Sequence, residues 1–282
     1  MSWTVDAHHH LWDLQVTPQD WLAGEPMAPI RRSFLPGDLV DAVAGRVEKT
    51  VIVQTVSEPD ETEVMLDYAA GCDLIGGVVG WVDLTGPEVE AKLEDLLQRP
   101  NGHRLVGIRH QVQDEPDTRW LCRPDVRRGL AAVGAAGLVY DLLTIPSQLP
   151  AAIETVAALP NVSFVVDHIS KPEIAAGVIE PWATDIANLA SFPNVTCKLS
   201  GMITEADWQR WTIDDLRPVA NIVLEVFGPD RVMFGSDWPV CLLAGTYADV
   251  ADSVNELTAH LDPNERAAIF GGVAARVYGL SE

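Results

Sequence analysis

Three consecutive histidines, His8, His9 and His10, follow a short apolar run near the start of the chain. Because alternate residues of a strand point to the same side, His8 and His10 can direct their ring nitrogens toward one point. Two neutral imidazoles in that arrangement suit a divalent cation. The run precedes Leu-Trp-Asp, which argues against a purification tag. The alternative is that these histidines only cap the strand by hydrogen bonding.

An aspartate, Asp237, lies at the end of the last β-rich run, within the segment Gly-Ser-Asp-Trp-Pro. A carboxylate beside a metal ion can hold a water molecule and take its proton, while the metal lowers the pKa of that water. We therefore interpret Asp237 as a general base that also binds the metal. An aspartate that caps the following loop is the alternative.

Another histidine, His168, ends an apolar run further up the chain. It is expected either to bind the metal or to donate a hydrogen bond to a substrate carbonyl, and the sequence leaves both roles open. A purely structural histidine is the alternative. Its position at the end of a run, like that of Asp237, makes it the second candidate catalytic residue.

Three cations also follow or end such runs, Arg109, Lys171 and Lys198. They could hold a substrate carboxylate or stabilise the oxyanion that forms when water attacks an ester carbonyl. Buried ion pairs with Asp6, Asp141 or Asp167 are the alternative. His110 and Trp238 complete the set that is expected to contact the substrate.

The elements that must position these side chains form a regular series. Short apolar runs typical of strands buried on both faces occur at residues 3–8, 50–55, 77–83, 105–110, 138–143, 163–168, 195–200 and 232–237. Stretches with helical spacing lie between them at residues 58–70, 87–97, 124–133, 146–159, 181–189 and 216–227. This alternation predicts an α/β fold, a (β/α)8 TIM barrel. A doubly wound open sheet is the alternative, but the chain has no Gly-x-Gly-x-x-Gly loop.

The unusual polar residues share one end of the predicted strands, the carboxyl end, where barrel enzymes build their active sites. In the run at 195–200, Thr196, Lys198 and Ser200 alternate with apolar residues. The outer face of a barrel strand must pack on apolar helices, so the polar set is expected to point inward. By the same argument Val232 and Phe234 face outward.

Residues 14–39 interrupt the series, with four prolines and Trp21. Loops of this length are usually functional, and we predict a lid-like loop inserted after the first strand. No second domain boundary is visible, so residues 1–282 are expected to form one barrel domain.

The composition excludes several classes of partner. The chain has 19 Lys and Arg against 41 Asp and Glu, a net charge of −22, which disfavours binding to nucleic acid or to a membrane surface. The four cysteines have no zinc-ribbon or redox spacing, and neither a signal peptide nor a membrane span is visible. We expect a cytoplasmic protein, monomeric or homodimeric, that acts on a small molecule and has no organic cofactor.

These segments, in this order, resemble the "amidohydrolase 2" branch of the amidohydrolase superfamily, and within it the sugar-lactonase group. The resemblance covers nearly the whole chain. It is carried by DAHHHLWD at residues 6–13, GVVGWVDL at 77–84, GIRH at 107–110, DH at 167–168 with KP at 171–172, KLSG at 198–201 and GSDWP at 235–239.

The resemblance implies a distorted barrel and a hydrolase of carboxylic esters that opens aldonolactones. It implies one divalent metal, zinc or manganese, or none, with His8 and His10 matching the ligands and Asp237 the acid of the last strand. Binuclear relatives carry a bridging lysine or glutamate on the fourth strand and histidines on the fifth and sixth. This chain has Arg109 and His110 on the fourth strand and Tyr140 and Asp141, with no histidine, on the fifth, which disfavours a binuclear centre.

Two other functions remain open at this point. Members of the same branch carry out metal-dependent, non-oxidative decarboxylation of aromatic or muconate-like acids. The GWVDL segment and the DH and KP segments favour the lactonase over that chemistry. A catalytically inactive barrel that only binds a ligand is the other alternative, and the presence of His8, His10, His168 and Asp237 together argues against it.

Overall fold

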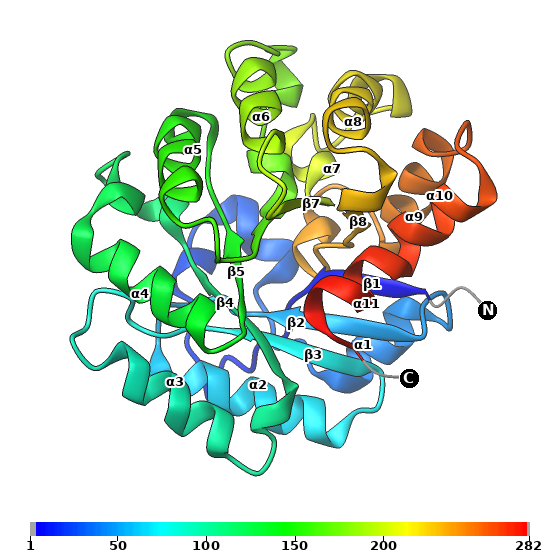
Figure 1. Cartoon of the computed structure of the whole chain (residues 1–282). Helices are drawn as coiled ribbons and strands as arrows, with labels where there is room; N and C mark the ends of the chain where they lie inside the picture. Colours follow the sequence, from blue (N-terminus) through cyan, green and yellow to red (C-terminus); the bar gives the residue numbers. More distant parts are fainter. Residues whose placement is uncertain (1–3, 281–282) are drawn as a thin grey trace.

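A computed structural model describes residues 4–280 and contains an eight-stranded parallel sheet whose strands follow one another in chain order (Figure 1). Each strand pairs with the next from first to last. The strands are β1 (Val5–His9), β2 (Lys49–Val53), β3 (Ile75–Gly80), β4 (Leu105–His110), β5 (Val139–Leu142), β6 (Phe164–Val166), β7 (Val195–Leu199) and β8 (Val232–Phe234).

Helices surround this sheet, as Figure 1 shows, and the arrangement is the predicted (β/α)8 barrel. They are α1 (Pro36–Val43), α2 (Pro59–Gly71), α3 (Val89–Gln98), α4 (Pro124–Ala135), α5 (Leu149–Ala158), α6 (Trp182–Ala190), α7 (Met202–Glu205), α8 (Ile213–Phe227), α9 (Tyr247–Leu257), α10 (Pro263–Ala267) and α11 (Val273–Tyr278).

The barrel closes between its first and last strands through the residues that follow β8. His9 and Trp238 form an isolated parallel bridge, and the His10 N–H donates to the Trp238 carbonyl at 2.7 Å. The Asp237 N–H donates to the His8 carbonyl at 2.8 Å. This seam is irregular, because an isolated bridge takes the place of a regular ladder, and β1 also shifts register against β2 between Asp6 and His9. The closure therefore joins the two segments that carry the predicted metal ligands.

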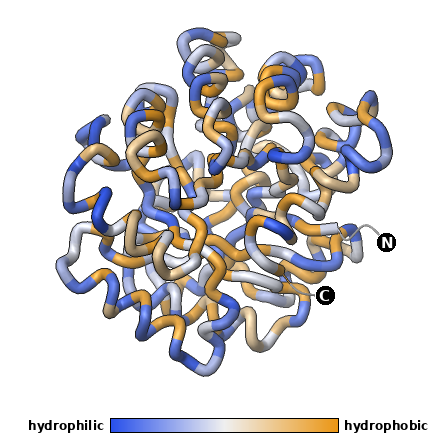
Figure 2. Tube along the Cα trace, in the orientation of Figure 1, coloured by the Kyte–Doolittle hydropathy of each residue, from blue (hydrophilic) through white to orange (hydrophobic). Residues whose placement is uncertain are grey.

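Buried apolar residues of the strands divide between two clusters, one outside and one inside the barrel wall. Figure 2 shows that apolar residues are frequent along the central strands. On β8, Val232 and Phe234 pack outward against helices, as predicted, while Met233 joins an inner cluster of valines. Helix α11 closes the amino end of the barrel, since Val273 and Tyr278 pack into that inner cluster. The polar residues are left to the carboxyl end.

Several predicted boundaries differ from the structure. The strand expected at 163–168 ends at Val166, because the backbone turns into the left-handed region from His168 onward. The strand expected at 232–237 ends at Phe234. Trp3, at the start of the first predicted strand, lies outside the described residues.

The segment predicted as a lid-like loop, 14–39, ends earlier than expected. Helix α1 begins at Pro36, where a proline in the first turn costs no hydrogen bond, and the Asp38 carboxylate accepts from the Leu35 N–H. Before it, the segment forms short 3-10 turns at Asp20–Leu22 and Glu25–Ile30. The Trp12 indole donates to the Arg32 carbonyl at 2.7 Å and ties the base of the loop together.

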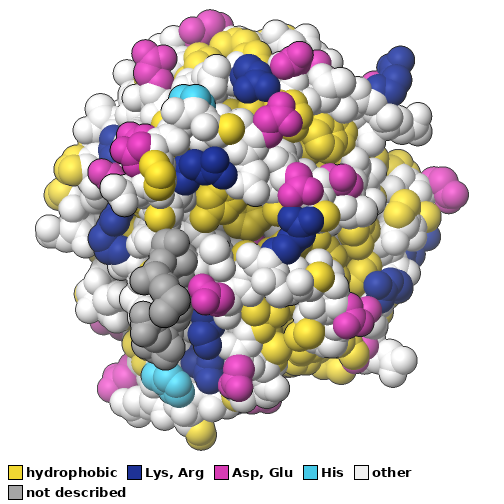
Figure 3. Space-filling model, turned by 90° about the vertical axis from the view of Figure 1, so that its right-hand side faces the viewer, with side chains coloured by type: hydrophobic (Ala, Val, Ile, Leu, Met, Phe, Trp, Pro, Cys, Tyr) yellow, Lys and Arg dark blue, Asp and Glu magenta, His cyan; other side chains and the backbone are white. Residues whose placement is uncertain are grey.

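Charged side chains of both signs are interspersed over the face shown in Figure 3. The acidic excess is therefore not gathered into one patch on that side. Among the described residues, no helix is long and apolar enough to cross a membrane.

Candidate active site

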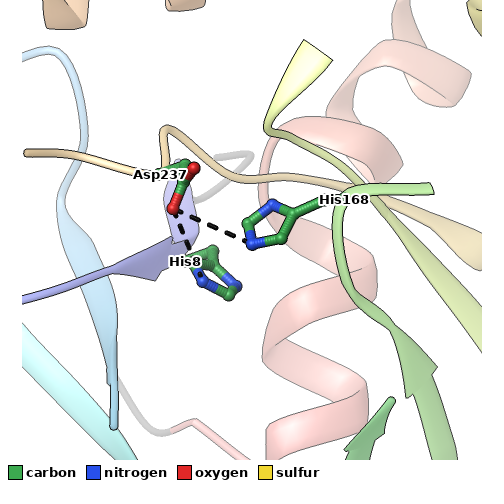
Figure 4. A group of neighbouring side chains, drawn as sticks. All are labelled: His8, His168 and Asp237. Atoms are coloured by element: carbon green, nitrogen blue, oxygen red, sulfur yellow. Dashed lines mark ion pairs between the residues drawn. The ribbon is translucent and has the colours of Figure 1, made fainter. Parts of the chain in front are cut away.

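Side chains from opposite ends of the chain converge at the carboxyl end of the barrel, where His8, His168 and Asp237 point toward one another (Figure 4). One donor atom of each lies within 4.8 Å of the others. His168 and Asp237, together with His10, border a cavity of about 270 Å³, close to the lower end of small-molecule sites, and His8 is not among its lining residues. The cavity is therefore suited to a ligand of the size of a single sugar.

Three imidazoles direct the same nitrogen, Nε2, toward Asp237. The distances to Asp237 Oδ1 are 3.3 Å from His10 and 3.8 Å from both His8 and His168. The Nε2 atoms of His8 and His10 are 3.2 Å apart. All four side chains are buried.

The opposite ring nitrogens are held by neighbouring groups, which fixes the orientation of each ring. His10 Nδ1 lies 2.7 Å from the Val53 carbonyl, and His168 Nδ1 lies 3.0 Å from the Ser200 hydroxyl. His8 Nδ1 lies 3.3 Å from Asp167 Oδ1. Metal-binding histidines in proteins are oriented by contacts of this kind through their second nitrogen.

The donor set fits one tetrahedral or five-coordinate divalent ion. Bonds of about 2.1 Å at tetrahedral angles place neighbouring donors about 3.4 Å apart, and the contacts among His8, His10 and Asp237 are 3.2 to 3.8 Å. Burial lowers the pKa of His8 well below its ordinary value and that of His168 to about 4. Both rings are therefore neutral, as metal binding requires.

Asp237 is ionised in this setting. Burial alone would raise its pKa, but His168, His10 and Lys171 outweigh that effect, so the pKa lies below the ordinary value of an aspartate. Its backbone is in the left-handed region, with φ of 56°. Strained residues of this kind cluster at functional sites.

His168 begins a second strained segment, a left-handed turn of four residues that runs to Lys171 with φ between 48° and 57°. Such a turn costs L-residues about 1–2 kcal/mol each. Hydrogen bonds from outside hold it: the Trp182 indole donates to the Ile169 carbonyl at 2.7 Å, and the hydroxyls of Ser170 and Thr144 are 2.9 Å apart. The turn brings both His168 and Lys171 to the cavity.

Gly201 allows the His168 ring to lie where it does. A Cβ at this position would stand 2.7 Å from His168 Nδ1, and the φ of Gly201 is +66°. Both facts require glycine here. The segment KLSG therefore places Ser200 and makes room for the histidine that Ser200 contacts.

A network of buried charges lies beneath the three histidines. Lys198 Nζ is 2.5 Å from Asp141 Oδ2, 3.0 Å from Asp167 Oδ1 and 3.1 Å from His8 Nδ1. Arg109 Nη1 lies 3.1 Å from Asp167 Oδ2. The ion pairs considered as an alternative for Arg109 and Lys198 are thus present, and Lys198 does not line the cavity.

Arg109 also contacts the loop that follows β2, and this contact helps to fix the position of its guanidinium. Its guanidinium donates to the Gln54 side chain at 3.0 Å and also to the Gln54 carbonyl. That loop is held by buried Glu61, which accepts from the backbone N–H groups of Thr55 and Val56. Burial raises the pKa of Glu61 to about 7.

Lys171 also lines the cavity, and its Nζ lies 3.6 Å from Glu205 Oε1. Burial raises the pKa of Glu205, while the charge of Lys171 opposes that rise. Sequence reasoning did not single out Glu205, which is the last residue of α7. Its position in the segment after β7 could have identified it, since loops at that end of a barrel line the active site.

Other lining residues were also not singled out as site residues. Trp21 and Met27 come from the segment predicted as a lid and form part of the cavity wall. The remaining residues missed by the sequence reasoning are Thr55, Gln111, Gln113, Asp114, Leu143, Thr204, Trp208, Val240 and Leu243.

His110 and Trp238, which were expected to contact the substrate, are not among the cavity-lining residues. His110 accepts from the Trp81 indole at 3.0 Å, contacts Glu115 at 2.8 Å and stacks on Trp120. Trp238 is buried against Phe34. Of the predicted site residues, the structure brings His10, Arg109, His168, Lys171 and Asp237 to the cavity wall.

The fold and this constellation are those of a hydrolase of the barrel type, and comparison with known families agrees. Residues 5–280 match the family described as Amidohydrolase. The chain belongs to that family.

Two curated relatives cover nearly all of the chain. It is 38% identical to an L-fucono-1,5-lactonase of Burkholderia multivorans, over 99% of this chain and 96% of the relative. It is 35% identical to an L-fucono-1,5-lactonase of Burkholderia ambifaria, over 99% and 97%. A crystal structure of an amidohydrolase from Burkholderia multivorans with bound zinc superposes with a TM-score of 0.93, at 36% identity, over 99% of this chain and all of that one.

Proposed function

We propose that this protein is a hydrolase that opens the ring ester of a sugar-acid lactone. Two of its curated relatives are named L-fucono-1,5-lactonases. The observation that carries the proposal is the ionised, buried Asp237 on the wall of a sugar-sized cavity, facing the imidazoles of His8, His10 and His168. A base placed beside a water site is what ester hydrolysis requires.

In the proposed reaction, Asp237 takes a proton from water as the water oxygen attacks the lactone carbonyl carbon. The carbonyl electrons move onto oxygen, where Arg109 stabilises the negative charge. Collapse of that intermediate breaks the bond between the carbonyl carbon and the ring oxygen. The proton held by Asp237 then passes to the ring oxygen, which leaves an open-chain hydroxy acid.

We further propose that His8, His10, His168 and Asp237 hold one divalent ion, zinc or manganese. The separations of their donor atoms and the contacts that orient each ring support this. When bound, the ion would lower the pKa of a coordinated water and polarise the carbonyl. Arg109 Nη1 lies 3.3 Å from His8 Nε2, so the guanidinium competes for one of these donors.

The proposed activity belongs to carbohydrate metabolism, and we propose that it takes place in the cytoplasm. The four cysteines support this location because they are unpaired, as cysteines of reducing compartments are.

Acid release from a panel of aldono-1,4- and 1,5-lactones, followed with a pH indicator, tests the proposal. The protein is assayed as purified, after chelation, and after resupply of zinc or manganese. Stereoselective release well above spontaneous hydrolysis is expected, and loss on chelation would support the metal site. Release of CO2 from an aromatic acid without lactone opening would favour the decarboxylase instead. Saturable binding without any turnover would favour an inactive binding barrel.

A further inference from the structure

Both cations on the cavity wall already have carboxylate partners. Arg109 pairs with Asp167 at 3.1 Å inside the barrel, where both side chains are almost fully buried. Lys171 pairs with Glu205 at 3.6 Å, where the two side chains are 25% and 27% exposed. Among the described lining residues, no arginine or lysine is left without an acidic neighbour.

The wall also carries more carboxylates than cations. Glu205 and Asp237 lie on it, and Asp114 stands at an exposed position of the same wall. A substrate carboxylate that entered near Lys171 would meet the Glu205 charge in a partly desolvated space, where repulsion between like charges is strong. A hydroxyl group meets no such penalty, since it can donate to Glu205 and accept from Lys171.

We infer that Glu205 is a specificity-determining residue that makes this site select uncharged polyhydroxy lactones over lactones that bear a free carboxylate. The inference rests on the proposed lactone hydrolysis. Glu205 pairs with Lys171, which would otherwise attract an anion. Its own negative charge also repels an incoming carboxylate. Rejection of a competitor by an unfavourable charge is a common source of specificity.

The test compares the best neutral aldonolactone of the panel with the monolactone of the matching aldaric acid, which carries a carboxylate in place of the terminal carbon group. The ratio of kcat/KM for the two lactones is measured for the unmodified protein and for Glu205→Gln. Glu205→Asp retains the charge, and Glu173→Gln removes an exposed glutamate that does not line the cavity. Glu205→Ala replaces Glu205→Gln if the latter does not fold.

We expect Glu205→Gln to shift the ratio toward the anionic lactone by about tenfold or more, chiefly through KM. Glu205→Asp and Glu173→Gln should keep the original ratio. An unchanged ratio in a folded, active Glu205→Gln variant would overturn the inference and leave the lactonase proposal intact. Absence of turnover of every neutral lactone by the unmodified protein would instead refute the lactonase proposal itself.

Discussion

Each histidine at the mouth of the barrel has one nitrogen engaged by the protein and the other directed at Asp237. His10 uses the Val53 carbonyl, His168 the Ser200 hydroxyl and His8 the Asp167 carboxylate for this purpose. The sequence predicted the histidines and the aspartate, since their positions at strand ends were visible. The partner of His10 could not be predicted, because a main-chain carbonyl has no sequence signature.

Lys198 shows the limit of reasoning from residue type alone. Its inward direction followed from the alternation of the run at 195–200 and is confirmed by its contacts with Asp141 and His8. Whether an inward lysine contacts substrate or a buried acid depends on its depth in the barrel. That depth is set by the packing of neighbouring strands, which the sequence of one strand does not contain.

Glu61 provides a prediction about stability and pH. Its pKa of about 7 in the folded protein is above the ordinary 4.5, so the folded state holds this proton more tightly than the unfolded state. The contribution of Glu61 to stability is therefore full below about pH 4.5 and falls as pH rises through 7. We expect Glu61→Gln to flatten this fall, measured as Tm between pH 5 and pH 8.

Asp67→Asn, an exposed change on the same helix, is the control and should retain the original pH dependence of Tm. A Glu61→Gln profile parallel to that of the unmodified protein would contradict the raised pKa.

At the scale of elements, the turn from His168 to Lys171 decides how the site is assembled. The sequence run at 163–168 reads as a continuous strand, because Val165 and Val166 favour extended backbone. The left-handed turn is imposed from outside, by Trp182 and Thr144 and by the space above Gly201. These contacts span distant parts of the chain and were not predictable from the local pattern.

Gly201→Ala tests this turn directly. The new Cβ would displace the His168 ring, so we expect kcat/KM for the lactone to fall at least about tenfold, because small misplacements of reacting groups are costly. Gly177→Ala is the matched control, since Gly177 also has a positive φ, 65°, but open space around it. We expect Tm to decrease by similar amounts in both variants, but activity to be lost only in Gly201→Ala. Equal activity in the two variants would contradict the positioning role.

At the scale of the whole molecule, the candidate metal ligands come from both ends of the chain. The barrel was predictable because apolar runs of strand length alternate with helical ones. Its distortion was implied only by the family resemblance and not by the strand pattern, because closure occurs through single hydrogen bonds of His10 and Asp237 rather than through a regular ladder. The site sits on this seam, so an ion bound there would connect β1 with the segments after β6 and β8.

Metal binding is therefore expected to stabilise the whole barrel. Zinc or manganese at about 100 times its dissociation constant would add about 2.7 kcal/mol, which corresponds to a rise in Tm of about 5 °C for a chain of this size. Thermal unfolding of chelated protein, with and without added metal, measures this. His168→Ala should lose most of the rise, and an unchanged Tm in the unmodified protein at excess metal would argue against the site.

The assignment of Asp237 as the base of a lactone hydrolysis is tested most directly by one comparison: the rate of acid release from the best aldonolactone by the unmodified protein and by Asp237→Asn. Because asparagine keeps the shape of the side chain but cannot take a proton, kcat should fall by about 10²–10⁴-fold while circular dichroism and Tm remain close to those of the unmodified protein. Near-normal turnover by a folded Asp237→Asn variant would contradict the proposed mechanism.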